Sequence, residues 1–204
     1  MLFSVLLITA FVLFQISAPT IQEGPGAWLN TGSNTVALAL NLVPFAGIAF
    51  LWFIGVIRDR LGDREDRFFS TVFFGSGILF LGMLFTWAAV IGAILIAFGG
   101  EGAGQPVNSA AFAFARADAY SIVNVYMVKM AGVFMISTST VAVYTGFSPR
   151  WLAIAGYVLS LILLFGSYYL SWCFVVFPGW VFLISLFILR ENMIRSSDGA
   201  IGGE

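Results

Sequence analysis

WLAIAGYVLSLILLFGSYYLSWCFVVFPGWVFLISLFIL, Trp151–Leu189, is a run of 39 residues without a charged side chain. A membrane-crossing helix needs about 20 apolar residues, because the hydrocarbon core of a bilayer is about 30 Å thick. The run is long enough for two crossings, so we expect two antiparallel helices with a break near Leu170 to Trp172. Pro178 then falls in the first turns of the second helix, where a proline ring costs little.

The rest of the chain has the same apolar character. Of its 204 residues, 60% are hydrophobic and 9% are charged, and the mean hydropathy is +1.00. A soluble domain carries about 25% charged residues, so lipid must cover part of this surface. We therefore expect one all-α integral membrane domain over residues 1–204, a bundle of six transmembrane helices. The expected spans are 2–18, 36–57, 68–98, 122–147, 151–169 and 173–189.

The first span has a second interpretation, as a cleaved signal peptide. A positively charged start is missing, and Ile16-Ser17-Ala18 is a mediocre cleavage site. We expect a retained helix, and cleavage would leave the later threading unchanged.

The basic residues predict the orientation of the bundle. Seven of the nine Lys and Arg lie between the second and third spans, between the fourth and fifth, or after the sixth; they are Arg58, Arg60, Arg64, Arg67, Arg150, Arg190 and Arg195. Six crossings place all seven on one side, opposite Arg116 and Lys129. Because cytoplasmic loops of membrane proteins are enriched in Lys and Arg, we expect both termini in the cytoplasm and a multi-pass protein of the cytoplasmic (inner) membrane.

The fourth span carries a polar face. Residues at three- and four-residue spacing share one side of a helix, and here they are Tyr126, Lys129, Val133, Ser137, Thr140 and Tyr144. An intramembrane lysine marks a functional site by default. The favoured interpretation is that Lys129 lies one turn inside the outer edge and extends to water, or packs against a helix; transport along this face is the alternative. The hydroxyls of the Ser137–Thr140 run are expected to bond back to their own helix or across to a neighbouring helix.

Four arginines alternate with four acids in Arg58–Arg67. The cluster is nearly self-neutralising, which favours a tight cytoplasmic turn between two helices. The alternative is a contact loop in which Arg58, Arg60, Arg64 and Arg67 dock a partner or anionic lipid headgroups, although the interleaved acids weaken the lipid version. On the opposite side, the Gly-rich run 99–104 is expected to be a flexible loop, and 109–120 an interfacial helix.

The missing residue types exclude several chemistries. The chain has no His, and Cys173 is its one cysteine. An imidazole ligand for haem or zinc, a His-based triad and an intramolecular disulfide are therefore excluded. We predict no catalytic, metal-binding or cofactor-binding residue and no nucleic-acid partner. A lipid-acting membrane enzyme is not expected but stays open.

Four segments carry a resemblance to a known family. They are Phe50–Gly62, Glu65–Gly77, Met130–Thr140 and Pro149–Ala153. These resemble an uncharacterised family of bacterial, actinobacterial-type multi-pass integral membrane proteins, over about Ala37 to Leu189. The resemblance implies location and architecture and no activity. We expect a non-enzymatic membrane component that packs against lipids, partner subunits or a second copy; a small transporter or channel is the alternative.

Overall fold

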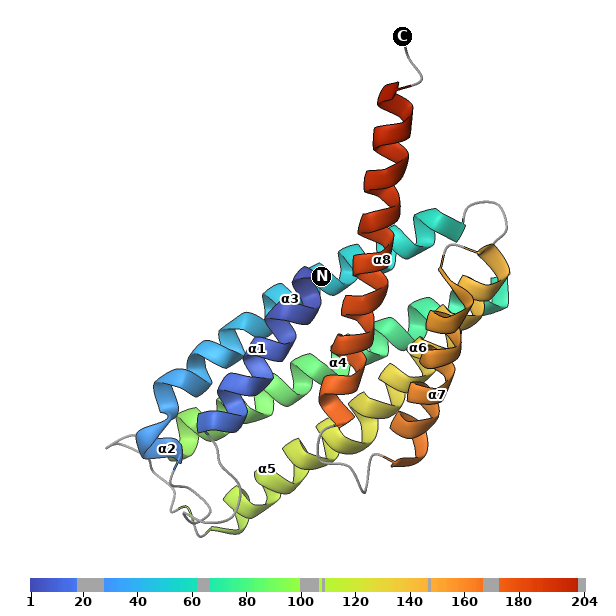
Figure 1. Cartoon of the computed structure of the whole chain (residues 1–204). Coiled ribbons are helices and arrows are strands. Elements are labelled where there is room, and N and C mark those ends of the chain that lie inside the picture. The colour runs from blue at the N-terminus through green and yellow to red at the C-terminus, as the bar shows by residue number, and fades with distance from the viewer. Residues whose placement is uncertain are drawn as a thin grey trace.

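The computed structural model describes residues 1–17, 28–61, 67–99, 107, 109–146, 148–166 and 173–201, with only the backbone described at some helix ends. Within these ranges the regular structure is entirely helical, as predicted (Figure 1). The helices are α1 (Leu2–Ser17), α2 (Trp28–Thr31), α3 (Ser33–Leu61), α4 (Arg67–Phe98), α5 (Ala110–Ser121), the π-helix η2 (Ile122–Met127), α6 (Val128–Thr145), α7 (Arg150–Gly166) and α8 (Cys173–Ile201).

The long helices alternate in direction along the bundle (Figure 1). Helix α1 packs against α3, α4 lies against both α3 and α6, and α7 packs against α6. Helix α8 contacts α1, α6 and α7, and its last turns project beyond the other helices. Helices α3 and α6 end, and α4 and α7 begin, at the same end of the bundle as this projection (Figure 1). We call it the basic end, because Arg58, Arg150 and Arg190 are there.

Three helices are long and apolar enough to cross a membrane: Ser33–Asp59, Ser70–Phe98 and Ala110–Thr145. The helices Leu2–Ser17, Arg150–Gly166 and Val175–Arg190 are apolar but shorter. At 1.5 Å per residue the 16-residue α1 is about 24 Å long, somewhat less than a bilayer core of about 30 Å.

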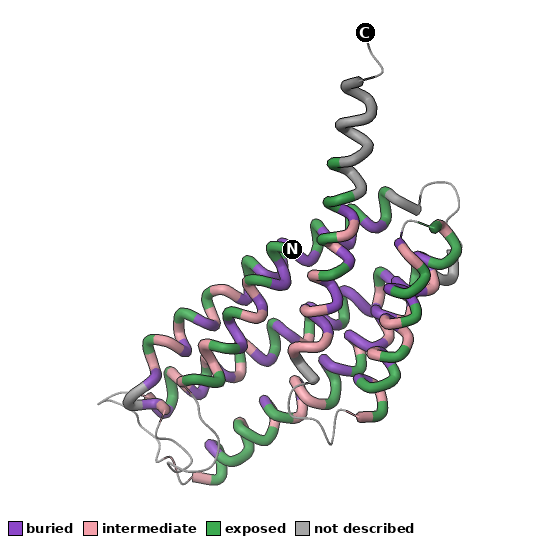
Figure 2. Tube along the Cα trace, viewed as in Figure 1, coloured by how far each residue is buried: buried purple, intermediate pink, exposed green. Residues whose placement is uncertain are grey.

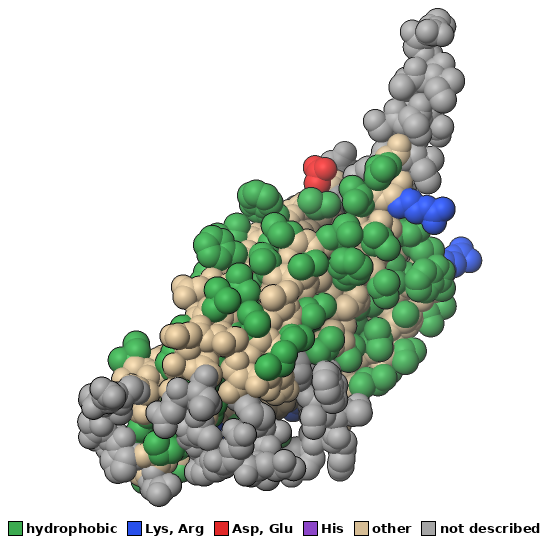
Figure 3. Space-filling view, turned by 60° about the vertical axis from the view of Figure 1, so that its left-hand side comes forward, with side chains coloured by type: hydrophobic (Ala, Val, Ile, Leu, Met, Phe, Trp, Pro, Cys, Tyr) green, Lys and Arg blue, Asp and Glu red, His purple; other side chains and the backbone are tan. Residues whose placement is uncertain are grey.

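The surface of the bundle is apolar along most of its length. Buried residues lie on the inward faces of the helices and exposed ones on the outward faces (Figure 2). Many of the outward side chains are large and hydrophobic, among them Phe45, Ile96, Phe114 and Phe165. Figure 3 shows such side chains covering the face in view, with basic and acidic side chains at its upper end. A surface of this kind suits contact with lipid rather than water.

The predicted helix at 109–120 is continuous with the fourth span. The Ser109 hydroxyl accepts a hydrogen bond from the backbone N–H of Phe112 (3.3 Å) and caps α5. From there α5, η2 and α6 form one helix of 36 residues, Ala110–Thr145, which is about 54 Å long. This length exceeds a bilayer core of about 30 Å, and the interfacial position of residues 109–120 stays a prediction.

Pro44 lies inside α3, and its ring frees the carbonyl group of Leu40. Asn41 does not satisfy this group, because its Nδ2 donates to the carbonyl oxygen of Ala37 (2.9 Å). Trp87 of α4 packs against another helix: its ring lies 5.5 Å from that of Phe11 on α1.

The helix ends differ modestly from the predicted spans. Helix α3 begins before residue 36 and continues past 57, and α8 runs beyond Leu189 to Ile201. The predicted break near Leu170 to Trp172 and the loop at Gly62 lie outside the described residues.

Candidate functional site

The predicted polar face of the fourth span is divided between the interior and the surface. Tyr126, Lys129 and Tyr144 are exposed, whereas Ser137 is buried and Thr140 is half-buried. Thr140 faces the seam between α6 and α7, because its hydroxyl lies 2.8 Å from that of Tyr157 on α7. The structure thus takes Ser137 and Thr140 into the bundle and leaves the other three at its surface.

The hydroxyl run on α6 bonds mainly to its own helix. Ser137, Thr138 and Thr140 donate to the carbonyl oxygens four residues earlier, at 3.0, 2.8 and 2.9 Å. This confirms the predicted back-bonding. These hydroxyls are occupied within the helix, so they do not present a row of free polar groups.

Ser139 is the exception in this run. Its side chain is fully buried, and its Oγ has no hydrogen-bond partner. The hydroxyl instead occupies the space beside Gly156 of α7, where a Cβ atom would overlap it. The indole of Trp180, on α8, borders the same space and donates a long hydrogen bond (3.5 Å) to the Leu152 carbonyl oxygen. Helices α6, α7 and α8 therefore meet at one notch, which is open because Gly156 has no side chain.

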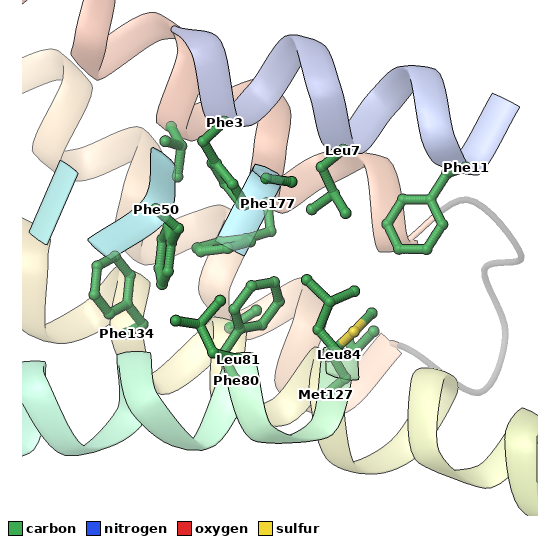
Figure 4. Packing of buried hydrophobic residues seen from close by; sticks show 14 of the residues in the cluster. Phe3, Leu7, Phe11, Phe50, Phe80, Leu81, Leu84, Met127, Phe134 and Phe177 are labelled. Carbon is green, nitrogen blue, oxygen red and sulfur yellow. The ribbon is translucent and has the colours of Figure 1, made fainter. Parts of the chain in front are cut away.

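The centre of the bundle is filled by phenylalanine. Five helices each contribute one buried ring, and we call this set the phenylalanine hub (Figure 4): Phe3, Phe50, Phe80, Phe134 and Phe177. Phe50 lies within 4.6 to 5.7 Å of the other four ring centroids, distances typical of favourable aromatic packing. Composition did not reveal this hub, since the chain has 22 Phe and nothing in their spacing marks these five.

The predicted contact loop is described in part. Arg58 is exposed, and its guanidinium carbon lies 6.0 Å from the ring centroid of Phe74 on α4, within cation–π range. Arg64 lies outside the described residues, and for Arg60 and Arg67 only the backbone is described. Trp52 and Trp151 are exposed on the helices that lead to this end, as expected of interfacial rings.

An open apolar groove lies between α3 and α4. Its volume is about 360 Å³, and it is lined by Leu40, Val43, Pro44, Phe85, Ala88 and Ala89. These side chains offer no charged or hydrogen-bonding group. The groove therefore suits hydrocarbon and provides no means of chemical catalysis.

Within the described residues there is no group of three or more acidic, cysteine or histidine side chains that could hold a metal ion. Apart from the buried Ser139 hydroxyl, the polar groups described above bond within a helix or between helices, or stand singly on the surface. The arrangement as a whole supports packing and lipid contact. No protein-family model matches this chain, and neither a curated protein nor a solved structure matches it.

Proposed function

We propose that this chain is a six-span protein of the bacterial inner membrane, with both termini in the cytoplasm, that acts by packing against lipids and protein partners rather than by catalysis. The phenylalanine hub is the observation that carries this proposal. Five rings fill the axis along which a pore or a catalytic cavity would lie. We also propose membership of the actinobacterial-type multi-pass family, on the segments quoted above.

The six-span threading has support of its own. The alternating helices bring Arg58, Arg150 and Arg190 to one end, where the positive-inside rule puts the cytoplasm. The exposed apolar side chains between the two ends supply the lipid-facing band. The helices α1, α7 and α8 then cross with the bilayer slightly thinned or with flanking residues reaching the interface.

Reporter fusions test this threading. Alkaline phosphatase folds into an active enzyme in the periplasm, so a fusion after Gly62 is expected to be inactive and one after Gly104 active. Green fluorescent protein at the same two positions is the matched control and should give the opposite pattern. Phosphatase activity at Gly62 would contradict both the orientation and the span count.

Native mass measurement in mild detergent tests the packing role. We expect a second copy, another subunit or tightly held lipid to remain with the purified chain. A monomer that carries no other subunit and no lipid would contradict the proposal.

The alternative is a small transporter or channel that uses the polar face of the fourth span. It is favoured by the charge of Lys129, which no described residue pairs, and by the irregular η2 turn beside it, because π-turns are frequent at functional sites. Purified protein in liposomes should then carry a potassium or chloride flux that Lys129→Met abolishes. We expect no flux above that of empty liposomes, because the hub fills the bundle axis.

A further inference from the structure

The π-turn η2 decides which side chains of the fourth span face outward. Residues that face the interior of a bundle recur every three or four positions along a regular α-helix. After Ile122, the next residue to face inward would therefore be Val125 or Tyr126. The turn adds one residue, and the next inward residue is Met127, which is 2% exposed. Tyr126 is 58% exposed instead. The π-turn thus directs a tyrosine outward, one helical turn before Lys129.

Lys129 is an exposed cation. Among the described residues it forms no ion pair or hydrogen bond. Helices α4 and α7, which pack against α6, contain no acidic residue. On its own helix the nearest acid is Asp118, eleven residues away, about 16 Å along the axis. The described part of the chain therefore leaves the ammonium charge open to an external anion.

The depth of Lys129 fits the outer headgroup layer. Thr145 ends α6 next to the basic end, and Lys129 lies sixteen residues before it, about 24 Å along the helix. With a hydrocarbon core of about 30 Å, its Cα falls about 6 Å inside the outer boundary. Side chains on a helix lean toward its N-terminus, which here is the outer side, so the long stem brings the ammonium to the headgroups. Tyr126 lies about 5 Å further out, at the depth that tyrosine prefers.

Apolar side chains lie within about one helical turn of Lys129 on either side. Val125 is exposed on the same helix. Leu164 of α7 lies against Gly132, and its neighbour Phe165 is 78% exposed. A cation at headgroup depth above an apolar wall complements a molecule with an anionic head and hydrocarbon tails.

We propose that Lys129 and Tyr126 form a binding site for the phosphate of an anionic phospholipid in the outer leaflet. The ammonium pairs with the phosphate oxygens, and the tyrosine hydroxyl donates a hydrogen bond to them. This site rests on the orientation given under the proposed function, and it specifies one class of lipid that the protein holds.

Lipid titration followed by native mass spectrometry tests the site. The full chain in mild detergent is titrated with phosphatidylglycerol, which carries a net negative charge, and with phosphatidylcholine, which does not. We expect phosphatidylglycerol to bind at least fivefold more tightly to the natural chain. Lys129→Met should lower that affinity about tenfold and leave phosphatidylcholine unchanged, while Lys129→Arg keeps most of it. Arg116→Gln is the matched control, since Arg116 is exposed on the same helix about 20 Å further out, and it should change nothing.

Two results would contradict the proposed lipid site. One is equal affinity of the natural chain for both lipids, and the other is undiminished phosphatidylglycerol binding by the Lys129→Met variant. If that variant does not fold, Tyr126→Phe, which removes only a hydroxyl, should still weaken phosphatidylglycerol binding two- to fivefold; no change would count against the proposal. Cross-linking of Lys129 to a protein in native membranes would assign the charge to a partner and also refute it. The reporter fusions decide the orientation separately, so the lipid site can fail while the threading stands.

Discussion

Gly156→Ala adds a single methyl group at the point where α6, α7 and α8 meet. The new Cβ would overlap the Ser139 hydroxyl and would lie 2.9 Å from Cζ2 and 3.0 Å from Nε1 of Trp180. Both neighbours are fully enclosed, with Ser139 at 0% and Trp180 at 1% exposure. The serine can turn its hydroxyl toward its own helix, but the indole ring has no free space to enter. We therefore expect this methyl group to separate α7 from α8.

The expected cost follows from two opposing terms. Overpacking a well-filled interior costs about 1–3 kcal/mol, whereas alanine favours a helix over glycine by about 1 kcal/mol. The second term is measured by Gly82→Ala on α4, because a Cβ at Gly82 meets nothing within 4 Å. Gly82→Ala should therefore be neutral or stabilising by up to about 1 kcal/mol. The difference between the two variants isolates the steric cost of about 1–3 kcal/mol.

The assay is reversible unfolding in mixed micelles with increasing dodecyl sulfate, followed by circular dichroism. Tryptophan fluorescence supports it, because one of the six tryptophans, Trp180, changes its environment when α8 separates from α7. The double variant Gly156→Ala/Ser139→Ala removes the overlapping hydroxyl and should recover part of the loss. Equal stability of the Gly156→Ala and Gly82→Ala variants would refute the expected steric conflict at the notch. So would a double variant that is no more stable than Gly156→Ala alone.

Three further changes test other parts of the bundle by the same unfolding assay. Phe50→Ala should cost about 3 kcal/mol, whereas Phe114→Ala, at an exposed ring, should stay within about 0.5 kcal/mol; equal effects would contradict the hub. Tyr157→Phe removes the hydrogen bond to Thr140 and should cost about 0.6 kcal/mol, and a cost above about 2 kcal/mol would indicate a larger role. Deleting Val125 makes the helix regular and should leave a folded, monodisperse protein in size-exclusion chromatography, whereas deleting Val133 should not; aggregation of both would contradict the π-turn account.

The helices could be predicted from the sequence because membrane spans are long apolar runs between charges. The third predicted span, 68–98, differs from α4 by one residue, since Arg67 and the Gly-rich run after Phe98 mark its ends. The back-bonding of Ser137, Thr138 and Thr140 was also predictable, because it depends only on the residue type and its own helix. Properties of a single helix are local, and the sequence carries them directly.

Contacts between helices were not predictable from the same pattern. Ser139 looks like its three neighbours in sequence, and it differs because Gly156 lies opposite on another helix. The π-turn was hidden for a related reason. Residues 122–128 are mostly apolar, so the five-residue step from Ile122 to Met127 becomes visible only when burial is known. Lys129 was expected near the outer edge from its sequence position alone, but its exposure beside a π-turn required the structure.

The membrane also changes how the phenylalanine hub contributes to stability. In water a buried ring gains from leaving the solvent, but in a bilayer the alternative to the hub is hydrocarbon, which is about as apolar. The gain must then come from packing and from ring geometry, which adds about 0.5–1.5 kcal/mol per aromatic pair. Phe50 has four such partners in the hub, so Phe50→Leu should lose much of the stability that Phe50→Ala loses, although it keeps most of the apolar volume. A Phe50→Leu variant as stable as the natural chain would show that volume alone holds the five helices together.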